Sequence, residues 1–142
     1  MTGSAAVAER IVVGYIPSPQ GIAAFERAKD EAVRRSGRLV VVNTGHHGNY
    51  SDAAFATAED LDAIDAELTS AGIEHEVQQP TAGRDAAEEI LRVAEEQRAT
   101  LIVIGIRYRS QVGKLLLGST AQQVLLEAAC PVLAVKESAR SR

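Results

Sequence analysis

The chain is poor in cysteine and in long apolar runs, and each shortage excludes a class of protein. Its 142 residues include one cysteine, Cys130, so neither an internal disulfide nor a site with several cysteine ligands can form. No apolar run approaches the ~20 residues of a membrane-spanning helix, and residues 1–9 lack the apolar core of a secretory signal. The sequence therefore predicts a soluble, cytoplasmic protein without membrane contact.

Acidic residues are missing from one segment. Asp and Glu are absent between Gln97 and Leu126, although the whole chain has a formal net charge of -4. The cationic residues of that segment are Arg98, Arg107, Arg109 and Lys114. This local positive charge predicts a surface that faces an anion. Because the chain as a whole is acidic, we do not expect a nucleic-acid partner, which would require a basic face over the domain.

Apolar runs rich in β-branched residues alternate with segments of helical period, the pattern of a parallel sheet with helices on both faces. We expect strands at 11–15, 39–44, 74–79, 101–105 and 132–136, and helices at 20–36, 57–70, 85–98 and from residue 119 onward. Length and apolar content favour one domain, at 10–137, between flexible ends at 1–9 and 138–142.

The strand order follows from the handedness of the crossovers. Right-handed connections favour a doubly wound α/β fold with a five-stranded parallel sheet in the order 3-2-1-4-5. The chain then reverses between the first and fourth strands, which brings loop 16–21 opposite loop 105–118. Ligands of such sheets bind at that reversal. The polar third strand and the apolar fifth strand are predicted to lie at the edges.

Helical spacing also predicts the inner faces and ends of the helices. The first helix is expected to end at Gly37, and the last to begin at Ser119 with a capping box to Gln122. The predicted inner face of the first helix is formed by Ile22, Phe25, Ala28, Ala32 and Val33. The predicted inner face of the last helix is formed by Val124, Leu125 and Ala128.

A glycine-bearing segment, 105–120, joins the fourth strand to the last helix. Free backbone N–H groups at a helix start, beside the positive end of the helix dipole, bind anions such as phosphates. The P-loop pattern is absent, since Lys114 is followed by Leu115, and no Gly-x-Gly-x-x-Gly follows the first strand. Ser119 alone is better explained as a helix cap. Taken together, the segment favours anion binding.

These residues resemble the universal stress protein family. Gly105-Ile-Arg-Tyr108, then Gly118-Ser119, and later Cys130-Pro-Val-Leu-Ala-Val135 match the family's glycine loop and closing strand over about residues 10–136. The resemblance implies an α/β fold, frequent homodimers, and ATP or another adenine nucleotide in the crevice. This chain differs from the family pattern at two positions. Ile16 stands where nucleotide-binding members usually carry an aspartate for a sugar hydroxyl or a metal, and Tyr108 stands where the loop usually has its second glycine.

The resemblance also implies which residues would contact a nucleotide. It assigns the adenine contact to Thr44, a first-strand contact to Gly14, and the phosphate contacts to Gly105, Gly118, Ser119 and Thr120. Arg107 and Arg109 are suited to phosphate because a guanidinium group forms paired hydrogen bonds with it. Whether magnesium accompanies the nucleotide stays open, because the usual carboxylate is missing.

The remaining reactive residues predict no catalytic or metal site. His46 and His47 lack a third ligand at recognisable spacing, and His75 is expected to be exposed in the polar edge strand. Cys130 precedes an apolar strand and is expected to be a buried structural residue. The acidic residues at the start of the third helix are explained by the helix dipole rather than by catalysis; they are Asp85, Glu88 and Glu89.

Three functions follow for testing. The first is a stress-response regulatory protein that binds ATP, AMP or cyclic AMP in the crevice. The second, motivated by Ile16 and Tyr108, is a dimeric interaction or scaffold protein that has lost the nucleotide. The third, a slow nucleotide hydrolase, has the least support, because no metal-binding carboxylate accompanies the loop. In each case the apolar edge strand at Pro131–Val135 predicts a homodimer.

Overall fold

A computed structural model gives the fold of the chain and describes residues 8–44, 56–81, 83–107 and 117–137. Several predictions fall outside these residues. They concern most of the flexible ends, the histidines at 46 and 47, and the loop residues Tyr108, Arg109, Gly113 and Lys114.

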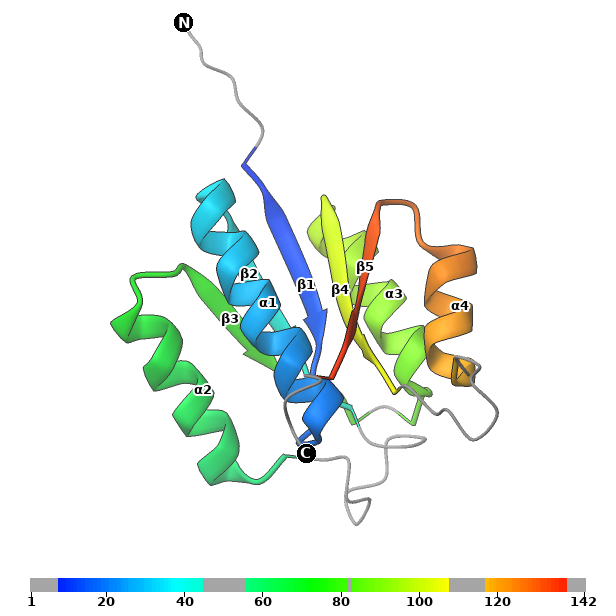
Figure 1. The fold of residues 1–142 in the computed structure, drawn as a ribbon, viewed down its shortest axis with the longest axis horizontal. Helices are drawn as coiled ribbons and strands as arrows, with labels where there is room; N and C mark the ends of the chain where they lie inside the picture. The colour runs from blue at the N-terminus through cyan, green and yellow to red at the C-terminus, as the bar shows by residue number, and fades with distance from the viewer. Residues whose placement is uncertain (1–7, 45–55, 82, 108–116, 138–142) are drawn as a thin grey trace, which may run out of the picture.

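Five strands form one parallel sheet in the order β3-β2-β1-β4-β5, which confirms the predicted order (Figure 1). In chain order they are β1 (Arg10–Gly14), β2 (Arg38–Val42), β3 (His75–Gln78), β4 (Leu101–Ile106) and β5 (Val132–Lys136). The β-branched interiors of β1, β2 and β4 are buried, as expected for strands covered on both faces. The half-buried β3 and β5 form the edges.

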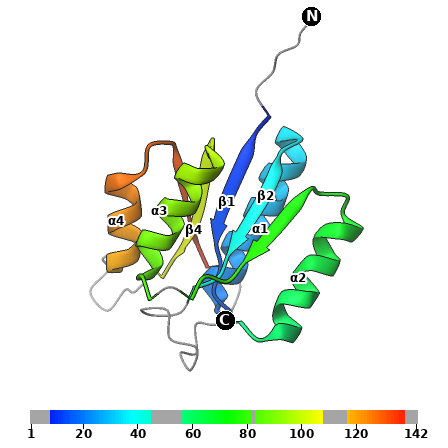
Figure 2. The same cartoon turned by 180° about the vertical axis from the view of Figure 1, so that it is seen from behind.

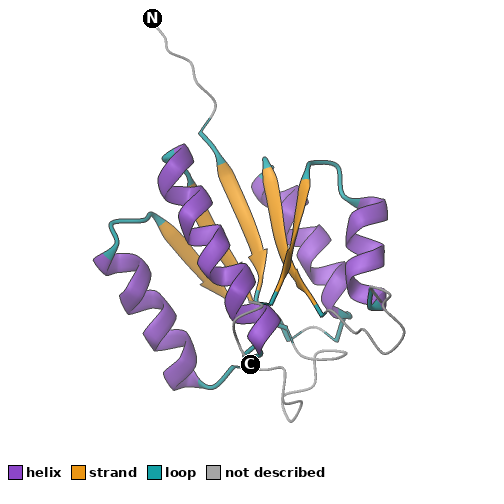
Figure 3. Cartoon of the chain, viewed as in Figure 1, coloured by secondary structure: helices purple, strands orange, loops and turns teal. Residues whose placement is uncertain are grey.

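Two helices cover each face of the sheet (Figures 2 and 3). In chain order they are α1 (Pro19–Arg35), α2 (Ala58–Ser70), α3 (Ala86–Gln97) and α4 (Ser119–Glu127). Helices α1 and α2 share one core with Ile11 and Val13 of β1, whereas α3 and α4 share the other with Val12. Alternate side chains of a strand point to opposite faces, so β1 supplies both cores. No helix in the described ranges is long and apolar enough to span a membrane.

Three apolar side chains predicted to face the core are exposed instead. Ile22 and Val33 of α1 expose 50% and 63% of their surface, and Leu125 of α4 exposes 40%. Successive residues of a helix are about 100° apart around its axis. Around the axis of α1, Phe25 lies at one margin of the buried stripe, and Ile22 and Val33 lie farther round on the same side, outside the stripe. That stripe is instead completed by the small residues Gly21, Ala24, Ala28 and Ala32. Small size, rather than hydrophobicity, therefore marks the inner face of α1.

Helix α1 also ends differently from the prediction. Ser36, with a φ of 52°, adopts the left-handed conformation that was expected of Gly37. The N–H groups of both residues donate to carbonyl groups of the last turn. Gly37 serves close packing, because a Cβ there would lie 3.0 Å from the carbonyl oxygen of Glu9.

Two buried glutamates were not predicted from the sequence. Glu31 of α1 and Glu89 of α3 are 4% and 1% exposed. Each carboxylate is covered by arginine side chains, and hydrogen bonds from Arg27 and Arg35 hold the pKa of Glu31 below its ordinary value. Glu89 is paired with Arg84 and Arg92. The dipole of α3, which the sequence offered as the reason for an acidic residue at position 89, is therefore not a sufficient explanation. The two arginine ion pairs balance the charge of the buried Glu89 carboxylate.

His75 is not exposed, contrary to the prediction, because α2 covers its side chain. Its Nε2 lies 2.7 Å from a carboxylate oxygen of Asp65, and its Nδ1 lies 2.7 Å from the carbonyl oxygen of Ile73. Burial lowers the pKa of His75, but these two acceptors outweigh it and raise the pKa above the ordinary value. The contact ties the edge strand β3 to α2.

Two glycines bring the first turn of α1 against the ends of β1 and β4. A Cβ on Gly21 would lie 1.9 Å from the carbonyl oxygen of Ile16, and one on Gly105 would lie 2.2 Å from the carbonyl oxygen of Gln20. Neither backbone contact leaves room for a side chain. The glycine at the end of β4 is thus required by the fold itself, whatever binds beside it.

This close approach predicts unequal effects of two alanine substitutions. Gly105→Ala is expected to lower the free energy of unfolding by about 3 kcal/mol, because the new methyl group must displace the first turn of α1. Gly118→Ala is the matched control: no atom lies within 4 Å of its Cβ position, so we expect a loss below about 1 kcal/mol. Urea unfolding at neutral pH measures both, and equal losses would contradict the packing argument.

Candidate functional site

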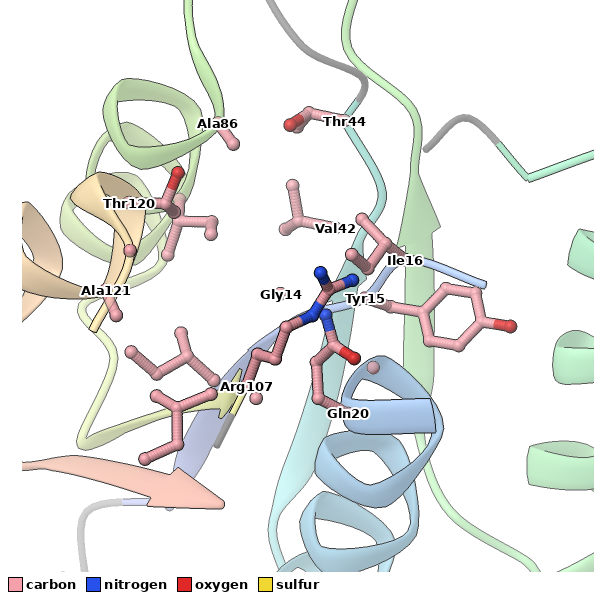
Figure 4. Close-up of a pocket in the computed structure, with 16 residues that line it drawn as sticks. Gly14, Tyr15, Ile16, Gln20, Val42, Thr44, Ala86, Arg107, Thr120 and Ala121 are labelled. Atoms are coloured by element: carbon pink, nitrogen blue, oxygen red, sulfur yellow. The ribbon is translucent and has the colours of Figure 1, made fainter. Parts of the chain in front are cut away.

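A cavity of about 230 Å³ lies at the carboxyl end of the central strands, at the predicted reversal of strand order (Figure 4). The ends of β1, β2 and β4 and the first turns of α1, α3 and α4 form its walls. The lining residues are Gly14, Tyr15, Ile16, Gln20, Gly21, Val42, Thr44, Ala86, Ile90, Ile104, Gly105, Ile106, Arg107, Gly118, Thr120 and Ala121.

The described walls are mainly apolar, and their one charged side chain is that of Arg107. Arg107 is exposed and forms no ion pair within the described part of the chain. Figure 4 shows the side chain of Arg107 beside that of Gln20, with Thr44 and Thr120 on two other sides of the cavity. An apolar enclosure with a cation and a few hydroxyl groups at its margin suits a ligand with an apolar body and an anionic end.

The start of α4 differs from the other helix starts. Ser18, Thr57 and Asp85 cap α1, α2 and α3 with their side chains, whereas Gly118 occupies the N-cap of α4 and provides no such bond. The first N–H groups of α4, at the positive end of its dipole, therefore have no side-chain cap beside the cavity. Thr120 and Ala121 of this turn line the cavity directly.

The capping box predicted for α4 is wrong. Ser119 is the first helical residue rather than the cap, and it accepts no capping bond. The side-chain amide of Gln122 instead donates to the carbonyl oxygen of Leu117 at 2.9 Å. The sequence pattern was misleading because a glycine, which caps only with its backbone, precedes the serine.

The cavity brings together most of the residues that the sequence singled out. Ser119 is the exception: it is exposed and does not line the cavity. The predicted residues that do line it are Gly14, Thr44, Gly105, Arg107, Gly118 and Thr120. These positions agree with a nucleotide-contact assignment but do not test it.

The sequence reasoning did not place the third helix at the cavity. Ala86 and Ile90 belong to the start of α3, which reaches the same edge of the sheet. Gln20 lies in the loop 16–21 that was predicted to face the crevice but was not singled out, and its side-chain oxygen is buried with no hydrogen-bond partner among the described residues. A polar residue directly after the proline that begins α1 was the available signal for Gln20.

Tyr15 contributes backbone rather than its ring to the cavity. The ring is turned away in Figure 4 and packs edge-on against Phe25, with ring centroids 6.0 Å apart. Burial, together with the nearby Asp60 carboxylate, raises the pKa of the Tyr15 hydroxyl. This residue therefore anchors the end of β1 to the α1 side of the core.

The described walls of the cavity do not suit a divalent cation. Among the described lining residues there is no carboxylate or imidazole, and Ile16 stands where the resemblance would place an aspartate. Over the described ranges, no group of three His, Cys, Asp or Glu side chains could hold a metal ion. Magnesium prefers oxygen ligands that include carboxylates, which these walls do not supply.

Cys130 lies far from this site, at the opposite end of β4. It is partly buried and packs against the core shared by α3 and α4. Burial raises the pKa of its thiol, which disfavours the reactive thiolate. This environment agrees with the structural role expected from the sequence.

Comparison with known proteins identifies relatives over nearly the whole chain. The universal stress protein family model matches residues 8–136. A universal stress protein of Mycolicibacterium smegmatis is 48% identical over 126 residues, and the match covers 89% of this chain and 96% of that protein.

Two solved structures from Archaeoglobus fulgidus share the fold. One is a universal stress protein with a TM-score of 0.72 and 30% identity, and the match covers 92% of this chain and 100% of that one. The other, a universal stress protein in complex with dAMP, has a TM-score of 0.63 and 23% identity and covers 92% and 98%. The second likeness shows the fold alone. From the family match and the bacterial relative, the chain belongs to the universal stress protein family.

Proposed function

We propose that the chain binds an adenine nucleotide in this cavity and acts as a stress-response regulatory protein. The observation that carries the proposal is the coincidence, in one cavity, of apolar walls, an arginine with no ion pair to any described residue, and a helix start without a side-chain cap. The apolar walls suit the flat base of a nucleotide, and the arginine and the helix start suit its phosphate.

The base has its place on the apolar side. Ile16, Val42 and Ile90 offer surfaces for a flat ring, and the hydroxyl group of Thr44 lies at the rim (Figure 4). The phosphate belongs on the other side, where Thr120, the first amides of α4 and Arg107 supply hydrogen-bond donors. Because the cavity is smaller than the roughly 300–1,000 Å³ of sites that enclose a drug-sized ligand, a nucleotide would fill it and extend beyond it.

The alternative of a scaffold that has lost its nucleotide has weaker support. Ile16, which motivated that alternative, forms one wall of the cavity and leaves about 230 Å³ of space beside it. The solved relative in complex with dAMP supports an adenine ligand for this fold. The other motivating residue, Tyr108, lies outside the described residues.

Binding rather than turnover fits the chemistry of the walls. Hydrolysis of a phosphate bond requires a group that activates water and a charge that stabilises the transition state. The described lining residues supply the charge through Arg107, but they include no general base. We therefore propose regulation through nucleotide occupancy.

Calorimetry with AMP tests this function. Wild-type protein is expected to bind AMP saturably, and EDTA should leave the Kd unchanged, because the donors that meet the phosphate are amides and a guanidinium group. Arg107→Ala is expected to weaken AMP binding about tenfold and to leave adenosine binding unchanged.

Arg98→Ala is the matched control, since Arg98 is also exposed and forms no ion pair within the described ranges but lies at the far end of α3. Loss of affinity on chelation would contradict the metal-free phosphate contact. No heat or thermal shift with millimolar AMP, ATP and cyclic AMP would overturn the proposed function.

We further propose that two copies of the chain associate through β5. This strand lies at an edge of the sheet, and the side chains from Val132 to Val135 are all half-buried. Among the described strands only β4 pairs with it. An apolar edge with an open side is a surface for strand pairing.

Light scattering at micromolar concentration is expected to give the mass of a dimer. Alternate amides of β5 face the open edge, so their hydrogen exchange should slow as protein concentration rises, while exchange in β3 stays constant. A monomer mass with exchange in β5 independent of concentration would rule out this assembly.

A further inference from the structure

A buried amide side chain follows β2, where the sequence shows a single asparagine after three valines. Asn43 is fully buried, although its place after an apolar run predicts only the end of a strand. Its position is at the carboxyl edge of the sheet, next to Thr44 of the cavity wall. A polar group buried there costs free energy unless it is fully hydrogen-bonded.

The Asn43 side chain bonds to three separate segments. Its Nδ2 donates to the carbonyl oxygen of Tyr15 at 2.8 Å. Its Oδ1 accepts from the N–H of Ala56 at 2.9 Å and from Nε2 of Gln79 at 2.8 Å. Nε2 of Gln79 also lies 3.0 Å from the carbonyl oxygen of Ala56, to which it donates. We call this arrangement of Asn43, Gln79, the Tyr15 carbonyl and the Ala56 backbone the Asn43 clamp.

The Asn43 clamp fixes segments that strand pairing alone does not join. Backbone bonds already connect neighbouring strand ends, from Tyr15 N to Val42 O at 2.8 Å and from Asn43 N to Gln78 O at 2.9 Å. The clamp adds Ala56, which lies two residues before α2, and connects β2 to the residues that follow both neighbouring strands. An apolar side chain of similar size would fill the space but leave the Ala56 N–H without this partner.

Two cavity-lining residues are covalent neighbours of the clamp. Thr44 follows Asn43, and Ile16 follows Tyr15, so the clamp sets the separation of the two backbone segments that carry them. Arg107 and the start of α4 belong to other walls, and within the described residues no hydrogen bond joins them to the clamp. The clamp therefore acts on the base side of the cavity and not on the phosphate side.

We propose that Asn43 is a positioning residue for adenine recognition and that Gln79 holds it in place. This inference rests on the proposed function, because it concerns the same cavity. The Asn43 clamp keeps Thr44 and Ile16 at the spacing that a planar base requires. Its loss weakens the binding of every ligand that carries the base, by the same factor with or without a phosphate.

Two variants test the clamp. Gln79→Met keeps the length of a half-buried side chain and removes its hydrogen bonds, whereas Asn43→Ala removes all the side-chain bonds of Asn43. Calorimetry with adenosine and with AMP, below the unfolding temperature of each variant, is expected to show at least a fivefold rise in Kd, equal for the two ligands. Gln79→Met carries the test alone if Asn43→Ala does not fold.

Glu31→Gln is the control, because it weakens a buried ion cluster near the other end of α1 and should lower the Tm without changing either Kd. Clamp variants that lose Tm but keep wild-type Kd values would overturn the proposal, as would a loss confined to AMP. Wild-type protein that binds neither ligand would refute the proposed function and this inference with it. Wild-type binding that the clamp variants retain would refute this inference alone.

Discussion

The contact between the first turn of α1 and the ends of β1 and β4 is the constraint on which the cavity depends. At Gly21 and Gly105 the backbone packs directly against another backbone segment. A Cβ on Gly21 would lie 1.9 Å from the carbonyl oxygen of Ile16, and a Cβ on Gly105 would lie 2.2 Å from that of Gln20. With the helix held there, the reversal of strand order leaves a space between α1 and the start of α4. Steric exclusion at two glycines thus shapes the wall that a ligand meets.

The buried polar groups fall into two kinds. Those that stabilise the fold have hydrogen-bond or ion-pair partners, as do Glu31 and Glu89 with their arginines and the members of the Asn43 clamp. Beside the cavity, Arg107 has no ion pair and the side-chain oxygen of Gln20 has no hydrogen bond to any described residue. Unused capacity at an otherwise well-bonded edge of the sheet is what a bound polar ligand would satisfy.

The sequence predicted the strand order and the place of the cavity because both depend on long-range rules of chain connection and on apolar runs. It failed where a local pattern had two physical explanations. Ile22 and Val33 looked like core residues, but small residues give α1 its close approach. Ser119 looked like a cap, but Gly118 occupies that position. Asn43 escaped notice because its three partners lie far apart in the chain and meet only in the folded structure.

The central claim is that an adenine nucleotide lies across the switch point with its base near Thr44 and its phosphate at the start of α4. A crystal structure of the protein with AMP tests this most directly. The account predicts the adenine ring between Ile16 and Ile90, with phosphate oxygens bonded to the amides of α4 and to Arg107. AMP bound in the reverse orientation, or only in the separate groove beside Cys130, would contradict it.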